Sequence, residues 1–253
     1  MTRSPLKSQL AIAQTAIPIN DPTVLDRGQH RSWPTQLAWL AGGLALSFAI
    51  PYFGSDVLNL PLTYYYLSYF VLTLAFLGAY IRATGVAVVA LLRIRWRTSL
   101  ALGILIGALV ITRVLSEATT PGPSGIQLAF ELLWRGAAYG TVDALLLTGF
   151  PCLLTLALLG GNVSGAKRKI AYVACSMVLI LTITTIYHLG FEQFRRDGLS
   201  APLIGNTMIS IPMLATTNPI GSILAHASMH IAATTHAYET PTFLPPQTHT
   251  PAH

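Results

Sequence analysis

The sequence predicts an all-α fold, a polytopic transmembrane helix bundle of about seven to eight helices with some short or re-entrant segments. Of the 253 residues, 53% are hydrophobic and only 9% are charged, and the mean hydropathy is +0.58. Soluble globular domains carry about 25% charged residues, so this composition excludes that class. Apolar stretches of the length that crosses a bilayer, about 20 residues, also recur along the chain.

Five stretches have the length and composition of transmembrane spans, at about 36–53, 60–82, 99–115, 126–147 and 170–191. Three others are shorter or more polar, at about 150–161, 202–217 and 219–236. We expect these three to form short helices, half-helices or re-entrant segments buried by protein. The piece 86–92, flanked by arginines, is too short to span and is predicted to be an interfacial helix.

The bundle is expected to occupy residues 34–236, between a polar N-terminal segment, 1–33, and a disordered Pro/Thr/His tail, 237–253. The N-terminal segment lacks the apolar core of a cleavable signal peptide, so the first span is expected to act as the targeting signal. Fifteen Lys and Arg against nine Asp and Glu give a net charge of +6. These basic residues lie largely in loops and at span ends, and no basic run is interleaved with exposed aromatics. We therefore expect the lipid bilayer and membrane proteins as partners, and no nucleic acid.

The placement of the basic residues predicts a cytoplasmic N-terminus. The N-terminal segment carries four of them, whereas the loop around Asp56 carries none. The arginines between 82 and 97 fit the same orientation. After residue 150 the rule gives no consistent answer, because the cluster 167–169 precedes one span and Arg195 and Arg196 follow it, so that one cluster must face outward.

Ionisable side chains inside apolar spans need a partner or a task, because a charge at the bilayer centre costs at least about 2.5–3.5 kcal/mol. Glu131 and Arg135 are four residues apart and are expected to form an ion pair on one helical face. This pair is either structural or holds a carboxylate that accepts protons or orients a substrate. Asp143 follows two turns later and can face the same interior, where it pairs with a neighbouring helix or takes part in catalysis.

Three histidines lie within or near the end of apolar runs. His188 follows a threonine-rich stretch and is either an interfacial residue bonded to a neighbour or a functional one. His226 and His230 are four residues apart on one face, a spacing that suits a shared metal or two hydrogen-bonding roles toward one ligand. The glutamate of the zinc-protease HExxH motif is absent, so an ordinary zinc protease is not expected and no metal ligand is assigned. The small residues of Gly221–Ser228 also permit close helix packing.

Four tyrosines, Tyr64, Tyr65, Tyr66 and Tyr69, gather where the second span begins. Tyrosine is enriched at membrane–water interfaces, where its hydroxyl reaches the headgroups. We therefore expect these side chains to form an interfacial belt, with a partner surface as the alternative.

Three segments, in this order, resemble the motifs of the CAAX-processing and bacteriocin-immunity (CPBP) family of intramembrane endopeptidases. Glu131-Leu-Leu-Trp-Arg135-Gly136 is similar to the second glutamate, the arginine and the following glycine of a Glu-Glu-x-x-x-Arg motif. His188 falls where a Phe-x-x-x-His motif would end, and His226 opens a His-x-x-x-Asn motif. The resemblance covers about residues 126–236 and implies a bundle of about eight helices.

The sequence departs from this pattern at three positions. Phe130 stands where the first glutamate is expected, Thr184 stands for the motif phenylalanine, and His230 stands for the terminal asparagine. In the family mechanism a glutamate and a histidine activate water, and the later His and Asn stabilise the oxyanion. Phe130 leaves no carboxylate at the base position, whereas His230 can still donate a hydrogen bond.

The missing glutamate favours a catalytically silent relative that serves as a binding or scaffolding subunit of a larger membrane complex. The alternative is an active endopeptidase that cuts a membrane-anchored or lipidated peptide. The resemblance then makes Glu131 the acid/base, Arg135 its orienter, His188 the water partner, and His226 with His230 the oxyanion side. Catalysis requires a carboxylate within hydrogen-bond reach of these histidines, about 3 Å directly or through one water.

A further alternative is a subunit that binds haem or a pigment through one of the three histidines, since a neutral imidazole in an apolar helix can serve as an axial ligand. The sequence contains no haem-attachment motif, and the cofactor is otherwise left open. A transporter would be expected to repeat the short broken segments of 202–236 in its first half, and no convincing repeat is found there.

Overall fold

The computed structural model describes residues 32–240, 243 and 245, and the predicted N-terminal segment 1–31 lies outside this part. In the described residues all regular structure is helical, in nine continuous helices. Five of the helices are long and apolar enough to cross a membrane, which confirms the predicted all-α membrane bundle. The helix count exceeds the predicted seven to eight because two of the nine helices have only six residues.

The five long apolar helices are Trp33–Val57 (α2 and η1), Leu62–Thr84 (α3), Trp96–Leu115 (α5), Gly125–Leu158 (α6 to α8) and Ala166–Leu189 (α9). The other four are α4 (Val88–Arg93), α10 (Glu192–Asp197), α11 (Ser200–Thr216) and α12 (Ile220–His236). The predicted interfacial helix at 86–92 corresponds to α4. The two segments expected to be short or re-entrant, 202–217 and 219–236, are full helices of 17 residues each.

The fourth long helix is one continuous element of 34 residues, so the prediction of a separate segment at 150–161 is wrong. It consists of α6 (Gly125–Glu131), η2 (Leu132–Ala138), α7 (Tyr139–Ala144), η3 (Leu145–Gly149) and α8 (Phe150–Leu158), where η2 and η3 are π-helical. Pro151 opens α8 but lies in the interior of the continuous helix, where a proline normally removes a hydrogen bond and clashes with the preceding turn. The π turn of η3 directly before it widens the helix, which lets the helix continue through the proline.

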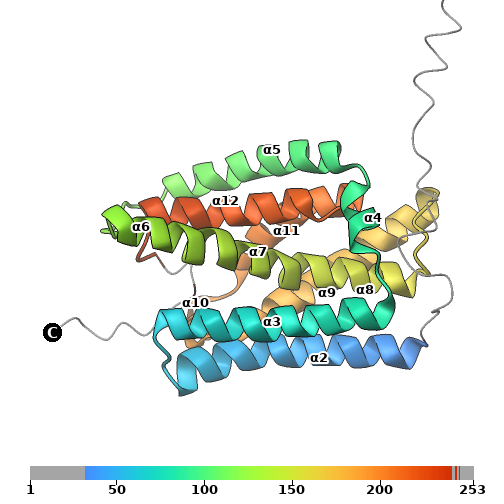
Figure 1. Ribbon diagram of the computed structural model, residues 1–253, viewed down its shortest axis with the longest axis horizontal. Helices are drawn as coiled ribbons and strands as arrows, with labels where there is room; N and C mark the ends of the chain where they lie inside the picture. The colour runs from blue at the N-terminus through green and yellow to red at the C-terminus, as the bar shows by residue number, and fades with distance from the viewer. Residues whose placement is uncertain (1–31, 241–242, 244, 246–253) are drawn as a thin grey trace, which may run out of the picture.

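The last helix, α12, runs along α5 on one side and along η2 and α7 on the other (Figure 1). The small residues noted in the sequence are what bring these helices together. A Cβ added to Gly103 of α5 would lie 2.5 Å from the Cα of Gly221, and one added to Gly140 of α7 would lie 2.7 Å from the Cα of Ala227. Glycine is therefore required at both crossings for the backbones to approach this closely.

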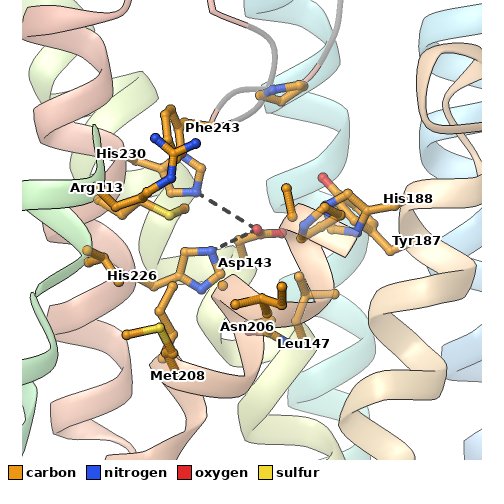
Figure 2. A pocket seen from close by; sticks show the side chains of 18 of the residues that line it. Arg113, Asp143, Leu147, Tyr187, His188, Asn206, Met208, His226, His230 and Phe243 are labelled. Carbon is orange, nitrogen blue, oxygen red and sulfur yellow. Dashed lines mark ion pairs between the residues drawn. The ribbon is translucent and has the colours of Figure 1, made fainter. Parts of the chain in front are cut away.

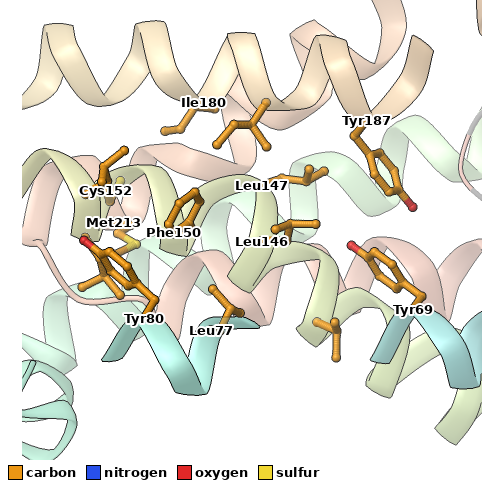
Figure 3. Packing of buried hydrophobic residues seen from close by; sticks show 14 of the residues in the cluster. Tyr69, Leu77, Tyr80, Leu146, Leu147, Phe150, Cys152, Ile180, Tyr187 and Met213 are labelled. Atoms are coloured by element: carbon orange, nitrogen blue, oxygen red, sulfur yellow. The ribbon is translucent and has the colours of Figure 1, made fainter. Parts of the chain in front are cut away.

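A second region of the core joins α3 to α7, α8 and α9, and Figure 3 shows Tyr69 and Tyr187 on opposite sides of it. Tyr65, Tyr66 and Tyr69 are buried in this region, and only Tyr64 is exposed, with 62% of its surface accessible. The prediction of an interfacial belt is therefore wrong for three of the four tyrosines. Their rings pack against other aromatic residues, as with Tyr66 and Tyr139, whose centroids lie 4.8 Å apart.

The alternating direction of the helices separates the two basic clusters that the sequence could not orient. Residues 167–169 lie at the end of the bundle that also holds α4, and Lys169 Nζ donates a hydrogen bond to the Leu214 carbonyl at 2.7 Å. Arg195 and Arg196 lie at the opposite end, where Arg195 forms an ion pair with Asp56. The cytoplasmic position of the N-terminus stays a prediction. If it is correct, Arg195 and Arg196 lie on the outer side of the membrane.

Candidate active site within the helix bundle

Asp143 of α7 lies at the centre of a buried polar cluster, near the middle of the 34-residue helix (Figure 2). The Tyr69 hydroxyl donates a hydrogen bond to Asp143 Oδ1 at 2.6 Å. Asp143 Oδ2 lies 3.1 Å from His226 Nε2 and 3.9 Å from His230 Nε2. The histidine cluster therefore has a carboxylate within hydrogen-bond reach, which is the condition that catalysis requires.

Local backbone structure places Asp143 in this position. Two π-helical segments, η2 and η3, lie directly before and after α7, and such segments occur frequently at functional sites because each one rotates the face of the helix that follows. Gly140, one turn before Asp143, brings α7 against α12, and a Cβ there would lie 3.0 Å from His230 Cδ2. The close crossing of the two helices is what brings the carboxylate to the imidazoles.

His226 and His230 project from one face of α12, as their spacing predicts. Their rings are nearly parallel, with centroids 5.1 Å apart and an angle of 11° between the ring planes. Both side chains are buried, and within the described residues Nδ1 of His226 lacks a hydrogen-bond partner, while the ring of His230 has only a backbone contact with Phe243. Buried polar atoms are normally hydrogen-bonded, so these incompletely paired imidazoles are suited to receive a ligand or water.

A cavity of about 560 Å³ opens beside this cluster. Asp143, His226 and His230 line it together with His188 from α9, and Figure 2 shows Asp143 between His188 and the histidines of α12. His188 Nδ1 lies 2.7 Å from the Thr184 carbonyl oxygen. Because a carbonyl only accepts, Nδ1 carries the hydrogen and Nε2 keeps a lone pair that can take a proton.

Thr184, at the motif phenylalanine position, belongs to a polar network beside the cavity. It accepts a hydrogen bond from Asn206 Nδ2 at 2.6 Å, and Thr148 bonds to Asn206 Oδ1 at 3.3 Å. This network fixes the amide of Asn206, which also lines the cavity. Sequence reasoning missed Asn206, although an asparagine in an apolar stretch was a signal that could have identified it.

Glu131 and Arg135 do not join the site, so their predicted ion pair is wrong. The two side chains, both in the described part of the chain, form no ion pair with each other, and neither lines the cavity. Arg135 instead donates to the Tyr238 carbonyl at 3.0 Å and lies 4.0 Å from the centre of the Tyr238 ring. Arg135 is buried and its guanidinium is held by Tyr238, whereas Glu131 is only half-buried and does not follow it into this contact.

The segment after α12 folds back against the bundle instead of beginning the predicted disordered tail at residue 237. Ala237 is buried, Tyr238 contacts Arg135, and Phe243 is buried at the cavity wall together with Pro245. Residues 241–242, 244 and 246–253 lie outside the described part of the chain.

The structure thus brings together three of the five predicted site residues, His188, His226 and His230, and adds Asp143 and Tyr69. Asp143 was recognised in the sequence without being assigned to the site, and Tyr69 was assigned to the membrane interface. Comparisons with protein-family models, with curated proteins and with solved structures find no match for the chain. The chemistry of this site therefore has to be argued from its own geometry.

Proposed function

We propose that the protein is an intramembrane hydrolase with its active site in the cavity between α7, α9, α11 and α12. The observation that carries the proposal is the contact of Asp143 with His226, at 3.1 Å, on the wall of a cavity that His188 also lines. A carboxylate and histidines that line one cavity are the groups that general acid–base catalysis uses. Their position halfway along an apolar helix supports a reaction inside the membrane.

Each polar side chain has a role in this proposal. Asp143, held by Tyr69, forms with His226 and His230 the surface on which the attacking water binds. His188 takes a proton from that water at Nε2 and returns it to the leaving group, a task for which its Nδ1 hydrogen bond to Thr184 fixes the tautomer. Acid–base catalysis of this kind contributes about 10²–10⁴-fold to a rate.

The substrate class follows from the rest of the cavity wall. Apolar side chains make up much of it, including Leu109, Val110, Met208, Ile209 and Phe194. Such a wall accommodates a hydrocarbon or an apolar peptide segment next to the polar cluster. Together with the resemblance to CPBP endopeptidases, this apolar wall supports cleavage of a membrane-anchored or lipidated peptide. Asp143 would then supply the carboxylate, because Phe130 stands at the position of the family's first glutamate.

The test compares three chains that are purified in detergent and reconstituted in liposomes. Wild type, Asp143→Asn and Glu131→Gln are incubated with a mixture of apolar peptides, and new termini are identified by mass spectrometry. We expect cleavage by wild type, a loss of at least about 100-fold in Asp143→Asn, and an unchanged rate in Glu131→Gln. Loss of activity in Glu131→Gln with retention in Asp143→Asn would assign catalysis to the CPBP-like motif instead.

The second candidate function is a silent binding or scaffolding subunit. The observation in its favour is that Glu131 and Arg135 lie outside the cavity, so the CPBP-like motif is not assembled. This function predicts that the chain extracted from native membranes travels in fixed stoichiometry with a larger complex and that no peptide is cleaved. The haem or pigment alternative predicts visible absorbance of the same purified sample.

A further inference from the structure

We propose that Asp143, His226 and His230 together bind one divalent transition-metal ion, with the open coordination position facing the cavity. The proposal deepens the proposed hydrolase function, because it names what would polarise the water and stabilise the developing oxyanion. Metal binding itself is measured without any substrate, so it can be tested separately from hydrolysis.

The donor set is the first argument. Two imidazoles and one carboxylate are the protein ligands of many catalytic zinc sites, which keep a fourth position for water or substrate. Other divalent transition metals use the same combination. In this structure the three residues are buried and offer ligand atoms that all lie within 4.8 Å of one another. His226 and His230 are four residues apart on one helical face, a spacing that suits a shared metal.

The distances are the second argument. In a tetrahedral site with bonds of about 2.0–2.1 Å, neighbouring ligand atoms lie about 3.3 Å apart. Asp143 Oδ2 lies 3.1 Å from His226 Nε2 and 3.9 Å from His230 Nε2. No two ligand atoms in the set lie more than 4.8 Å apart, so the widest distance has to shorten by at most about 1.5 Å to reach the tetrahedral value. Rotation of the two histidine side chains can bring the ligand atoms this much closer.

The unpartnered nitrogens are the third argument. A hydrogen-bonded Asp143–His226 pair without metal would account for His226 Nε2, but it leaves His230 Nε2, 3.9 Å from Asp143 Oδ2, without a side-chain hydrogen-bond partner in the described residues. Coordination through Nε2 gives His230 that partner. Tyr69 supports the same assignment, because its hydroxyl engages Oδ1 of Asp143 and leaves Oδ2 directed at the histidines. Such outer hydrogen bonds typically orient metal ligands.

The first experiment measures zinc content with Zn²⁺ as the only probe. The full chain is purified in detergent, stripped with a chelator, equilibrated with Zn²⁺ and analysed by mass spectrometry for metal. We expect about one zinc per chain in wild type and an almost complete loss in His230→Gln and Asp143→Asn. His236→Gln is the matched control, because His236 lies on the same helix and contacts the Glu117 carbonyl away from the cluster. Zinc content that is the same in wild type and in both cluster variants would overturn the proposal.

Two further measurements test the metal site even if His230→Gln and Asp143→Asn fail to fold. Tyr69→Phe keeps all three ligands and removes only the hydrogen bond to Asp143, so zinc affinity should fall by about 10- to 100-fold. X-ray absorption on zinc-loaded wild type should show two imidazole ligands and oxygen. A spectrum without imidazole scattering, or an unchanged affinity in Tyr69→Phe, would contradict the assignment.

The outcomes also separate this proposal from the proposed function. Peptide cleavage by a wild-type chain that does not bind zinc in the content measurement would overturn the metal site and leave the hydrolase standing. Stoichiometric zinc that the cluster variants lose, without cleavage of any peptide, would support the metal site and overturn the hydrolase.

Discussion

Replacing Gly140 with alanine should separate α7 from α12 and loosen the site. A Cβ at this position would lie 2.7 Å from the Cα of Ala227 and 3.0 Å from His230 Cδ2, whereas ordinary contact begins at 3.4 Å. The Ala227 backbone would therefore have to withdraw by about 0.7 Å, the difference between 3.4 and 2.7 Å. Overpacking of this kind costs about 1–3 kcal/mol of the free energy of unfolding. The contact of Asp143 with His226, which spans the same crossing, should lengthen as well.

The assay is unfolding of the purified chain by titration of SDS into mixed micelles, followed by circular dichroism. Gly78→Ala is the matched control, because a Cβ there meets nothing within 4 Å and alanine favours a helix interior by about 0.5–1 kcal/mol. Gly140→Ala should unfold at less SDS than wild type, and Gly78→Ala at the same amount or more. If Gly140→Ala were as stable as Gly78→Ala, the close crossing of α7 and α12 would be refuted.

Three more substitutions test other parts of the structure. Asn218→Ala removes the amide that donates to the Leu92 carbonyl at 2.8 Å and caps the start of α12, so it should lower the free energy of unfolding by about 1–3 kcal/mol in the same titration. Tyr139→Phe removes a buried 2.7 Å hydrogen bond to the Tyr187 hydroxyl and should cost about 0.5–1.5 kcal/mol; no loss would show that this bond contributes nothing. Phe243→Ala opens the cavity wall, so a chelator should extract bound zinc faster while equilibrium zinc content is unchanged; an unchanged extraction rate would show that Phe243 does not limit access.

Hydropathy predicts most of this fold because lipid-exposed helices need long apolar surfaces. The predicted spans 60–82 and 99–115 correspond to Leu62–Thr84 and Trp96–Leu115, within three residues at each end. The failure at 150–161 has a local cause. Pro151 resembles a helix break in sequence, but a π turn precedes it, and the sequence carries no pattern that reveals such a turn.

The candidate site was predictable within one helix and unpredictable where it depends on contacts between distant segments. His226 and His230 share a face because α12 is α-helical over its whole length. Glu131 and Arg135 have the same spacing, but Arg135 contacts Tyr238 from the segment after α12, a partner that the spacing does not reveal. The hydrogen bond between Tyr69 and Asp143 joins residues 74 positions apart and depends on the packing of α3 against α7. The periodicity of one sequence does not show which helices pack together.

The way the chain compensates its buried charges separates structural from functional polar residues. Arg135 is buried and contacts the carbonyl and the ring of Tyr238, which need no ligand, and its Nε lacks a hydrogen-bond partner in the described residues. Asp143 receives a hydrogen bond from Tyr69 on one oxygen, yet the imidazoles on its other side remain incompletely paired within the described residues, with His226 Nδ1 lacking any partner. A purely structural carboxylate at this depth would be expected to satisfy its neighbours, because each unpaired polar group in an apolar interior costs about 1–3 kcal/mol. That cost is recovered when a metal ion, a water or a substrate group enters the cavity and completes the cluster.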